Sequence, residues 1–326
     1  MNPTPNDVHV DSVLTELSLG FAQSSDEFVA SKVFPIVPVQ HRSDVYYIWD
    51  RADTLRSDMT FRAPGSESAG SGFRLAADDP YNCKVRALHV NLDDQTRANA
   101  VGDVDIQRDI TALLTQDAMI EKELDFGSRY FRPGIWATEQ NVANGESFGG
   151  AQWNADNATP IQDIRRLTRQ ARNKCGKPMN TIVFGGAAWD AFLDNPVVVD
   201  RFKHTIAGGQ TTDMAIATML GAERVLVGNA IYNPNNEGSA TESCDPILPN
   251  HVLACYTPSR PSIMSQAAGY TFAWTGYLNG AANDMGMVMS TFRMPENRSD
   301  RIEIESAYDH KLVSAECGSI LLNVIA

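Results

Sequence analysis

Apolar positions between Asp103 and Phe131 recur with the period of a helix and predict one long helix. Spacings of three, four and seven positions put six apolar residues on one face: Ile106, Ile110, Leu113, Ile120, Leu124 and Phe131. Acidic residues such as Glu123 fall elsewhere around the helix. Asp103 can cap the first turn, and Pro133 followed by a glycine ends the helix. At about 1.5 Å per residue the helix spans roughly 43 Å, which indicates an elongated building block.

The chain before this helix is predicted to form an arm and a long loop. Five apolar residues spaced as on one helix face indicate a short amphipathic helix in the arm: Val10, Val13, Leu14, Leu17 and Phe21. Prolines at positions 35 and 38 require an extended segment over 34–39, because each proline disfavours the helical conformation in the preceding residue. The arm either packs on its own subunit or crosses onto a neighbour. Aromatic and β-branched residues indicate strands over 45–49 and 83–92.

More than thirty residues rich in arginine, alanine, glycine and serine separate these two strands. Connections longer than about 15 residues are uncommon in compact domains unless they are functional or disordered. Fixing each backbone residue costs about 1 to 2 kcal/mol, so a loop this long needs a contact surface larger than its own subunit offers. We expect a neighbouring subunit to supply that surface, contacted through Arg51, Arg56, Phe61, Arg62, Phe73 and Arg74. The alternative is a floppy surface loop.

The second half of the chain alternates helices and strands, which indicates an α/β body. The clearest helix begins at Pro160 and ends at Gly176, and Thr159 and Gln162 have the spacing of a capping box. Its other face carries a basic cluster that is expected to be solvated or to form salt bridges between subunits: Arg165, Arg166, Arg169, Arg172, Lys174 and Lys177. Further elements are strand 181–185, helix 187–193, a helix from 195 toward 203, and segments 213–220, 223–227 and 252–256. Strands 301–308 and 311–325 are predicted to form a hairpin around Asp309 and His310, beside the long helix.

Composition narrows the class of protein. The chain holds 27 Lys and Arg residues against 40 Asp and Glu residues, and its formal net charge of -13 argues against a sequence-reading nucleic-acid binder. Five cysteines form an odd set without C-x-x-C spacing, so we expect reduced thiols that mostly fill the core. Apolar runs are too short for a membrane span, and the N-terminus lacks the pattern of a signal peptide. These features predict a soluble protein that is not exported by this route.

Motifs that carry chemistry are nearly absent. Gly185 and Gly186 follow a strand and precede a helix, as a phosphate cradle would, but no P-loop or G-x-G-x-x-G motif accompanies them, so a tight turn is favoured. The six histidines lack the spacing of a metal site, and there is no G-x-S-x-G motif. We therefore expect no catalytic residue, no cofactor and no metal.

Six groups of short motifs, densest over residues 8–135, resemble major capsid proteins of tailed bacteriophages and occur in the order found there. They are Val10-Asp11-Ser12-Val13-Leu14-Thr15, Phe28-Val29-Ala30 with Phe34-Pro35, Ser43-Asp44 with Tyr46-Tyr47, Arg51-Ala52-Asp53, Arg62-Ala63-Pro64-Gly65 with Ser68-Ala69-Gly70, and Asp93-Asp94-Gln95-Thr96-Arg97-Ala98-Asn99-Ala100. The resemblance implies an α+β chain with the Hong Kong 97-type capsid fold. Its implied parts are an N-terminal arm (1–42), an extended β-hairpin loop (43–95), a peripheral domain with a long spine helix (96–140), an α/β axial domain with a leading linker (141–290), and C-terminal strands returning to the peripheral domain (291–326).

The function implied by the resemblance is that of a major capsid protein of the virion. Such a chain assembles with itself into the hexamers and pentamers of an icosahedral shell, which encloses double-stranded DNA without reading its sequence. Assembly is expected in the host bacterial cytoplasm, with a portal and possible decoration protein as partners and no membrane. Only about forty residues precede the loop, so a separate scaffolding protein is expected in place of a fused scaffolding segment.

Two other functions are left open by the sequence. One is an encapsulin-like compartment shell with the same fold, and the other is a cytosolic α/β enzyme that uses the turn at Gly185. Some relatives in the capsid family also cross-link their subunits through a lysine near the loop tip. Residues 43–83 contain no lysine, and arginine cannot replace the amine because the guanidinium stays protonated. We therefore expect particles held by non-covalent contacts.

Overall fold

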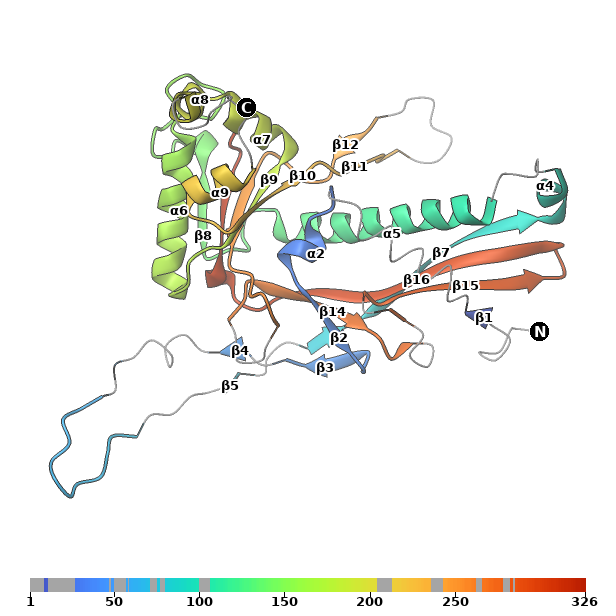
Figure 1. Cartoon of the computed structure of the whole chain (residues 1–326), viewed down its shortest axis with the longest axis horizontal. Helices are drawn as coiled ribbons and strands as arrows, with labels where there is room; N and C mark the ends of the chain where they lie inside the picture. Colours follow the sequence, from blue (N-terminus) through green and yellow to red (C-terminus); the bar gives the residue numbers. More distant parts are fainter. Residues whose placement is uncertain are drawn as a thin grey trace.

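The structure, a computed structural model, describes residues 9–10, 27–46, 48–49, 57, 59–70, 75–76, 80–99, 106–203, 213–235, 243–261, 266–277, 282–283 and 285–326. The chain forms a long slab, in which a helix lies along a sheet, and a second body at one end of that slab (Figure 1). A loop projects away from the same end as the second body (Figure 1). This elongated shape agrees with the building block that the long helical pattern predicts.

The slab contains a six-stranded sheet. Its strand order is β1 (His9–Val10), β15 (Met287–Met294), β16 (Ser299–Leu312), β14 (Gly269–Trp274) and β2 (Ile36–Val39), and β7 (Lys84–Asp93) pairs with β16 off this path. β7 and β15 pair antiparallel with the first part of β16, and β14 continues the pairing over its last part. The predicted strand over 83–92 and the extended segment over 34–39 are confirmed by β7 and β2.

The predicted long helix is confirmed by α5 (Ile106–Tyr130), but its buried face was predicted wrongly. Leu113 is 53% exposed, whereas its neighbour Leu114 is fully buried against β15 and β16. Lys122 and Glu123 are buried as well. The error arises because α5 contacts β16, β7 and the short arm helix α2 (Ala30–Val33). These tertiary contacts, and not the row of apolar residues in the sequence, determine which side of α5 is buried. The proposed N-cap, Asp103, lies outside the described residues.

The predicted C-terminal hairpin is wrong. β16 runs without a break through Asp309 and His310, which pair with Phe272 and Thr271 of β14. These two polar residues are satisfied inside the sheet, because His310 Nδ1 lies 2.8 Å from the Thr271 hydroxyl and Asp309 forms an ion pair with Arg129 of α5. In the sequence, the adjacent polar residues Asp309 and His310 look like a turn. Their partners lie far away along the chain, so the local sequence does not reveal that both residues are satisfied within a strand.

The turn that precedes β16 lies instead at residues 295–298, where Arg298 takes a positive φ of 48°. The last strand, β17 (Gly318–Leu322), leaves the slab and joins the sheet of the second body. The C-terminal segment therefore contributes one strand to each sheet.

The second body holds a five-stranded sheet in the order β10 (Arg224–Gly228), β9 (Thr181–Gly185), β13 (Val252–Cys255), β17 and β8 (Thr138–Asn141). Helices α6 (Pro160–Cys175), α7 (Gly186–Asp194), α8 (Pro196–Lys203) and α9 (Asp213–Leu220) pack around it (Figure 1). The predicted strands and helices of this region are confirmed. Every residue of β9, β13 and β17 is buried, which explains their continuous apolar sequences.

The boundaries of α6 were predicted correctly, but the capping box was not. Pro160 occupies the first turn and Gly176 ends the helix at a positive φ of 78°. The Thr159 side chain makes no cap hydrogen bond, and its backbone carbonyl accepts the amides of Gln162 and Asp163. The preceding loop folds over this end, since a Cβ on Gly149 would lie 3.0 Å from Thr159 Oγ1. The Thr159 hydroxyl oxygen is buried beneath this loop without a hydrogen-bond partner among the described residues.

Short elements complete the chain. The predicted strand over 45–49 is split into β3 (Ser43–Val45) and β4 (Ile48–Trp49). They pair antiparallel with β6 (Pro80–Asn82) and β5 (Leu75–Ala76), so the projecting loop begins as a hairpin. Other pieces are α4 (Asp94–Asn99), η1 (Val142–Asn144), η3 (Ala315–Cys317) and the pair β11 (Ile231–Tyr232) and β12 (Asp245–Pro246). In the arm, Val10 lies in β1, and the other residues of the predicted helix lie outside the described residues.

Candidate functional site: an exposed loop and an anchored arm

The loop tip, residues 59–70, is exposed at every position. Met59 and Phe61 are 96% and 109% exposed, the two most exposed large apolar side chains in the described part of the chain. Among the described residues, the hydrogen bonds of the tip lie within the tip itself, for example from the Ser66 amide to the Ala63 carbonyl at 3.1 Å. A Cβ built on Gly65 or Gly70 would meet no atom within 4 Å. Within the part of the chain that the structure describes, the tip therefore presents apolar surface without a partner.

Two of the six predicted contact residues lie in the described part of this loop. Phe61 points into solvent, and the Arg62 side chain donates to the Ser66 carbonyl. Arg51, Arg56, Phe73 and Arg74 lie outside the described residues, so their part in a contact stays a prediction. Met59 was not included in the predicted contact set. The sequence could have indicated it, because it is a large apolar residue in a polar loop, as Phe61 is.

Glu123 of α5 anchors the arm to the slab. Its Oε2 accepts hydrogen bonds from the backbone amides of Val29 and Ala30, at 3.1 and 2.9 Å, where α2 begins. Next to it on α5, Lys122 is 3% exposed, and its Nζ lies 5.2 Å from the centre of the Tyr308 ring. Burial lowers the pKa of Lys122 to about 8, although the neighbouring Glu123 carboxylate favours its charge. One buried carboxylate thus holds two segments more than ninety residues apart.

Glu123 should make stability depend on pH. Burial raises the pKa of Glu123 to about 7, although hydrogen bonds from Ala30 and Val29 favour the charged form. The folded chain therefore binds more protons than the unfolded chain between pH about 4.5 and 7, and the contribution of Glu123 falls as the pH rises through this window. Glu123→Gln removes the titration, so the stability advantage of wild type over this variant should shrink across the window by on the order of 3 kcal/mol. Urea unfolding of both chains at both ends of the window measures this, and a constant difference would contradict it.

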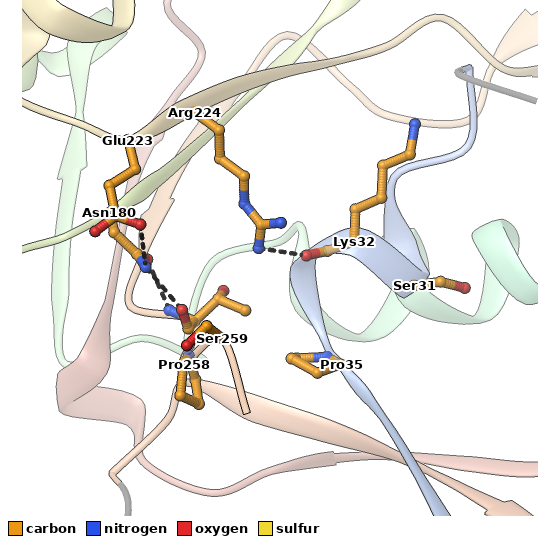
Figure 2. Close-up of a pocket in the computed structure, with 9 residues that line it drawn as sticks. Ser31, Lys32, Pro35, Asn180, Glu223, Arg224, Pro258 and Ser259 are labelled. Atoms are coloured by element: carbon orange, nitrogen blue, oxygen red, sulfur yellow. Dashed lines mark hydrogen bonds between the residues drawn. The ribbon is translucent and has the colours of Figure 1, made fainter. Parts of the chain in front are cut away.

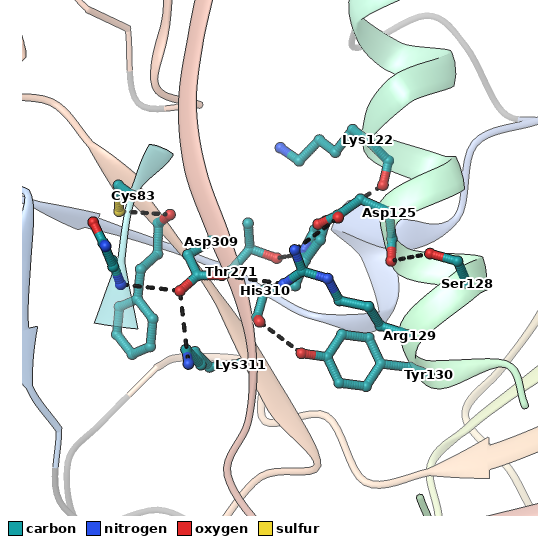
Figure 3. A network of polar contacts seen from close by, with 12 residues as sticks. Cys83, Lys122, Asp125, Ser128, Arg129, Tyr130, Thr271, Asp309, His310 and Lys311 are labelled. Carbon is teal, nitrogen blue, oxygen red and sulfur yellow. Dashed lines mark hydrogen bonds and ion pairs between the residues drawn. The ribbon is translucent and has the colours of Figure 1, made fainter. Parts of the chain in front are cut away.

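A network of polar contacts joins α5, β7 and the end of β16 (Figure 3). Arg129 bridges Asp125 at 2.9 Å and Asp309 at 3.3 Å, and Arg86 of β7 binds the same Asp125 oxygen at 3.1 Å. The Asp309 Oδ2 also accepts the backbone amide of Asn82 at 3.0 Å, where β6 meets β7. The network therefore connects the base of the projecting hairpin to α5.

The buried His310 completes the same region. Its Nδ1 lies 2.8 Å from the Thr271 hydroxyl, and its backbone carbonyl accepts the Tyr130 hydroxyl at 2.6 Å (Figure 3). Burial, followed by the nearby Lys122 cation, lowers the pKa of His310 well below its usual range. The imidazole is therefore neutral at physiological pH and serves as a structural hydrogen-bonding group.

A cavity of about 250 Å³ lies where the arm helix α2 meets the second body (Figure 2). Its polar side chains are used to join these parts. Arg224 donates to the Lys32 carbonyl at 2.7 Å and to the Thr181 hydroxyl at 2.9 Å, and the Asn180 amide donates to the Thr257 carbonyl at 2.7 Å. Thr257 in turn donates to the Val33 carbonyl at 2.9 Å. The cavity is therefore a second attachment point of the arm.

The Gly185 and Gly186 turn follows the predicted tight geometry. A Cβ on Gly185 would lie 2.2 Å from the Pro249 carbonyl oxygen, and one on Gly186 would lie 2.8 Å from Asn229 Oδ1. Glycine is needed here because another chain segment passes close to the backbone. The two glycines therefore lie in a tight strand-to-helix turn packed against residues 229 and 249, as the sequence predicted.

The described residues lack the side-chain clusters and helices of two other kinds of site. Among them, no group of three or more His, Cys, Asp or Glu side chains could hold a metal ion. Within the same residues, no helix has the length and apolar character needed to span a bilayer. Four of the five cysteines are buried and Cys244 is exposed, in agreement with mostly core-filling thiols.

Two sequence comparisons identify relatives of the chain. A family model described as phage major capsid protein E matches residues 139–230. The major capsid protein of Burkholderia phage BcepMu is 22% identical over 232 residues, which cover 68% of this chain and 70% of that relative.

Solved structures share the fold at low identity. A phage-related protein from Bordetella bronchiseptica RB50 matches with a TM-score of 0.73 at 17% identity, over 97% of this chain and 98% of its own. The capsid structure of cyanophage P-SCSP1u gives 0.54 at 13% identity, over 89% of this chain and 86% of its own. A virus-like particle from Pyrococcus furiosus gives 0.52 at 11% identity, over 95% and 97%.

The solved structures show the fold first: the chain has the mixed α and β fold of phage capsid structures such as that of cyanophage P-SCSP1u. Both sequence matches are to major capsid proteins of phages. The resemblance to phage major capsid proteins that the sequence motifs indicated is therefore confirmed.

Proposed function

We propose that this chain is the major capsid protein of a tailed bacteriophage, which assembles into the hexamers and pentamers of an icosahedral head enclosing double-stranded DNA. The observation that carries the proposal is the loop tip. On a capsid fold, Phe61 and Met59 stand in solvent at the end of a hairpin that its own subunit does not cover. Such a surface is stable in a soluble protein when a neighbouring copy covers it.

The proposed architecture is the Hong Kong 97-type fold. It divides the chain into an N-terminal arm (1–42), an extended loop (43–95), a peripheral domain (96–140), an axial domain (141–290) and returning C-terminal strands (291–326). The hairpin pairs β3–β6 and β4–β5 support the extended loop, and the position of α5 along the sheet supports a spine helix. Several strands do not follow these boundaries: β14 pairs in the slab, whereas β8 and β17 pair in the second body.

The loop of one subunit is proposed to bind apolar surface on the next. A candidate surface is the outer row of α5, where Leu113 is half exposed and Ile106, Ile110, Ile120 and Leu124 are only partly buried. Burying a phenylalanine side chain contributes about 1.5 to 3 kcal/mol, so Phe61 and Met59 together would supply a large part of one contact. The six loop residues Arg51, Arg56, Phe61, Arg62, Phe73 and Arg74 remain the proposed contact set.

The net charge of the chain supports self-association and an inner capsid wall that does not adhere to DNA. The net charge of -13 gives a neighbouring copy many carboxylates for pairing, and arginines 166, 169 and 172 on the exposed face of α6 are suited to bind them. The same negative charge keeps the wall from adhering to packed DNA, so the genome would be enclosed without sequence-specific binding. Host-cytoplasmic assembly, a separate scaffolding protein, a portal and a decoration protein belong to this proposal as partners of the head.

The compartment shell is the second candidate. It shares the fold, but both sequence matches are to phage major capsid proteins, so they favour the virion. Negative-stain electron microscopy of the expressed chain, alone and with the products of neighbouring reading frames, tests the proposal. Closed icosahedral particles are expected, and a small soluble oligomer under all these conditions would contradict it. Nucleic acid inside particles from phage-producing cells would distinguish a head from a compartment with peptide cargo.

Particles should contain no covalent bonds between subunits. Residues 43–83 lack lysine, so the loop carries arginine guanidinium groups that pair with carboxylates but do not form isopeptide bonds. Mature particles boiled in detergent with a reductant should run as one band near 35.7 kDa. A ladder of multiples of this mass would contradict the prediction.

A further inference from the structure

Two cysteines far apart in sequence meet in the core of the second body. Cys175 is the last residue of α6 and Cys317 is the last residue of η3, and their sulfur atoms lie 2.6 Å apart across 142 positions of sequence. A disulfide bond is about 2.05 Å long, so a small side-chain movement would join them. Both residues are at least 97% buried. No spacing motif in the sequence indicates this pair, because the fold alone brings the two segments together.

We propose that Cys175 and Cys317 form a reversible disulfide within one chain, which closes when the protein passes from the reducing cytoplasm to an oxidising medium. The disulfide can form within a single chain and does not depend on assembly. Only its proposed timing, when particles are released from the cell into an oxidising medium, rests on the proposed function. Among the other thiols, Cys255 lies 3.7 Å from the Thr257 hydroxyl, Cys83 lies 3.5 Å from the Phe272 carbonyl, and Cys244 is exposed.

The chemistry is thiol–disulfide exchange with a small-molecule disulfide as the oxidant. Cys175 is the attacking thiol, because hydrogen bonds from the Cys317 thiol and from the Lys177 backbone amide lower its pKa. Its thiolate attacks one sulfur of the oxidant, forms a mixed disulfide and expels the first small thiolate. The Cys317 sulfur, having lost its proton, then attacks Cys175 and expels the second small thiolate. Two cysteine protons and two electrons leave the protein, and one oxidant molecule becomes two thiols.

The bond would fasten the end of α6 to the segment that connects β16 with β17. That segment is where the chain passes from the slab into the second body, so the link would stabilise each subunit and leave contacts between subunits unchanged. A reductant should therefore lower the unfolding temperature of oxidised particles without dissociating them. Because both sulfurs are buried, oxidation waits for local opening and should be slow at low temperature.

The test uses the purified full-length chain and, separately, particles, each incubated with oxidised glutathione. The free thiols are then alkylated in denaturant, and the intact mass is measured. Oxidised wild type should lose two hydrogen atoms and two alkylation sites, and peptide mapping should recover a Cys175–Cys317 pair. Its unfolding temperature should rise by about 5 °C or more and return when dithiothreitol is added. All of these readouts can be obtained without shell assembly, so they separate failure of this proposal from failure of the proposed function.

Three variants provide the controls. Cys175→Ala and Cys317→Ala should show no redox-dependent shift, whereas Cys255→Ala, another fully buried cysteine of the same body, should respond like wild type. Oxidised wild type that keeps every alkylation site, or that carries only a stable glutathione adduct, would overturn the proposal. So would a disulfide that maps to another pair. These wild-type measurements decide the question even if an alanine variant does not fold.

Discussion

A chain lacking residues 61–73 should fold, stay soluble and form no shells. Residues 59–70 are exposed at every position and contribute nothing to the described cores, so removal of the tip should leave these cores intact. If the loop clamps neighbouring subunits, each contact loses its exposed aromatic anchor, and assembly should drop below detection. Circular dichroism and thermal unfolding should match wild type, while electron microscopy should show no particles.

Point variants test whether the Phe61 side chain itself binds the neighbouring subunit or whether only the length of the loop matters. Phe61→Ser removes the aromatic surface without shortening the chain and should reduce particle yield at least about tenfold, since a central aromatic contact is typically worth 2 kcal/mol or more. Ser68→Ala, in the same exposed tip, is the matched control and should assemble normally. Normal particles from the deletion variant would show that the loop does not hold subunits together.

Local signals were sufficient for much of the second body. Pro160 and Gly176 mark α6, the Gly185 turn separates β9 from α7, and Pro196 begins α8. Each of these signals acts through backbone conformation within a few residues, so it can be read without the tertiary structure. The base of the projecting loop was predicted only in part: the strand over 45–49 is present as β3 and β4, but their partners β6 and β5 lie in the stretch that composition assigned to the loop.

Features that depend on distant partners could not be predicted. The orientation of α5, the course of β16 through Asp309 and His310, and the meeting of Cys175 with Cys317 all depend on contacts between segments far apart in sequence. The exposure of Phe61 could be predicted because it follows from the polar composition of the surrounding loop, and the proposed contact role of the loop stays a prediction. Glu123 was missed for the opposite reason, because its role consists entirely of its bonds to the arm.

Glu123→Ala should destabilise the chain at neutral pH by about 3 kcal/mol and release the arm. The substitution removes the acceptor of the Val29 and Ala30 amides and a carboxylate that favours the charged form of the buried Lys122. Leaving a buried donor without a partner costs about 1 to 3 kcal/mol, and two amides lose their acceptor here. Burial destabilises the charged Glu123 carboxylate in wild type and raises its pKa to about 7. Removing this buried charge therefore recovers part of the stability that the variant loses.

Hydrogen exchange identifies where the damage occurs. In Glu123→Ala the amides of Val29 and Ala30 should lose protection, whereas the amides of β9 and β13 should change only as far as global stability falls. Glu123→Gln keeps a carbonyl that can accept both amides and should retain most of the protection. Glu121→Ala is the matched control on the same helix, because that half-exposed carboxylate pairs with Arg86 at the surface and should contribute no more than about 1 kcal/mol. Unchanged protection of Val29 and Ala30 in Glu123→Ala would mean that the cavity contacts of Arg224 and Thr257, and not Glu123, hold the arm in place.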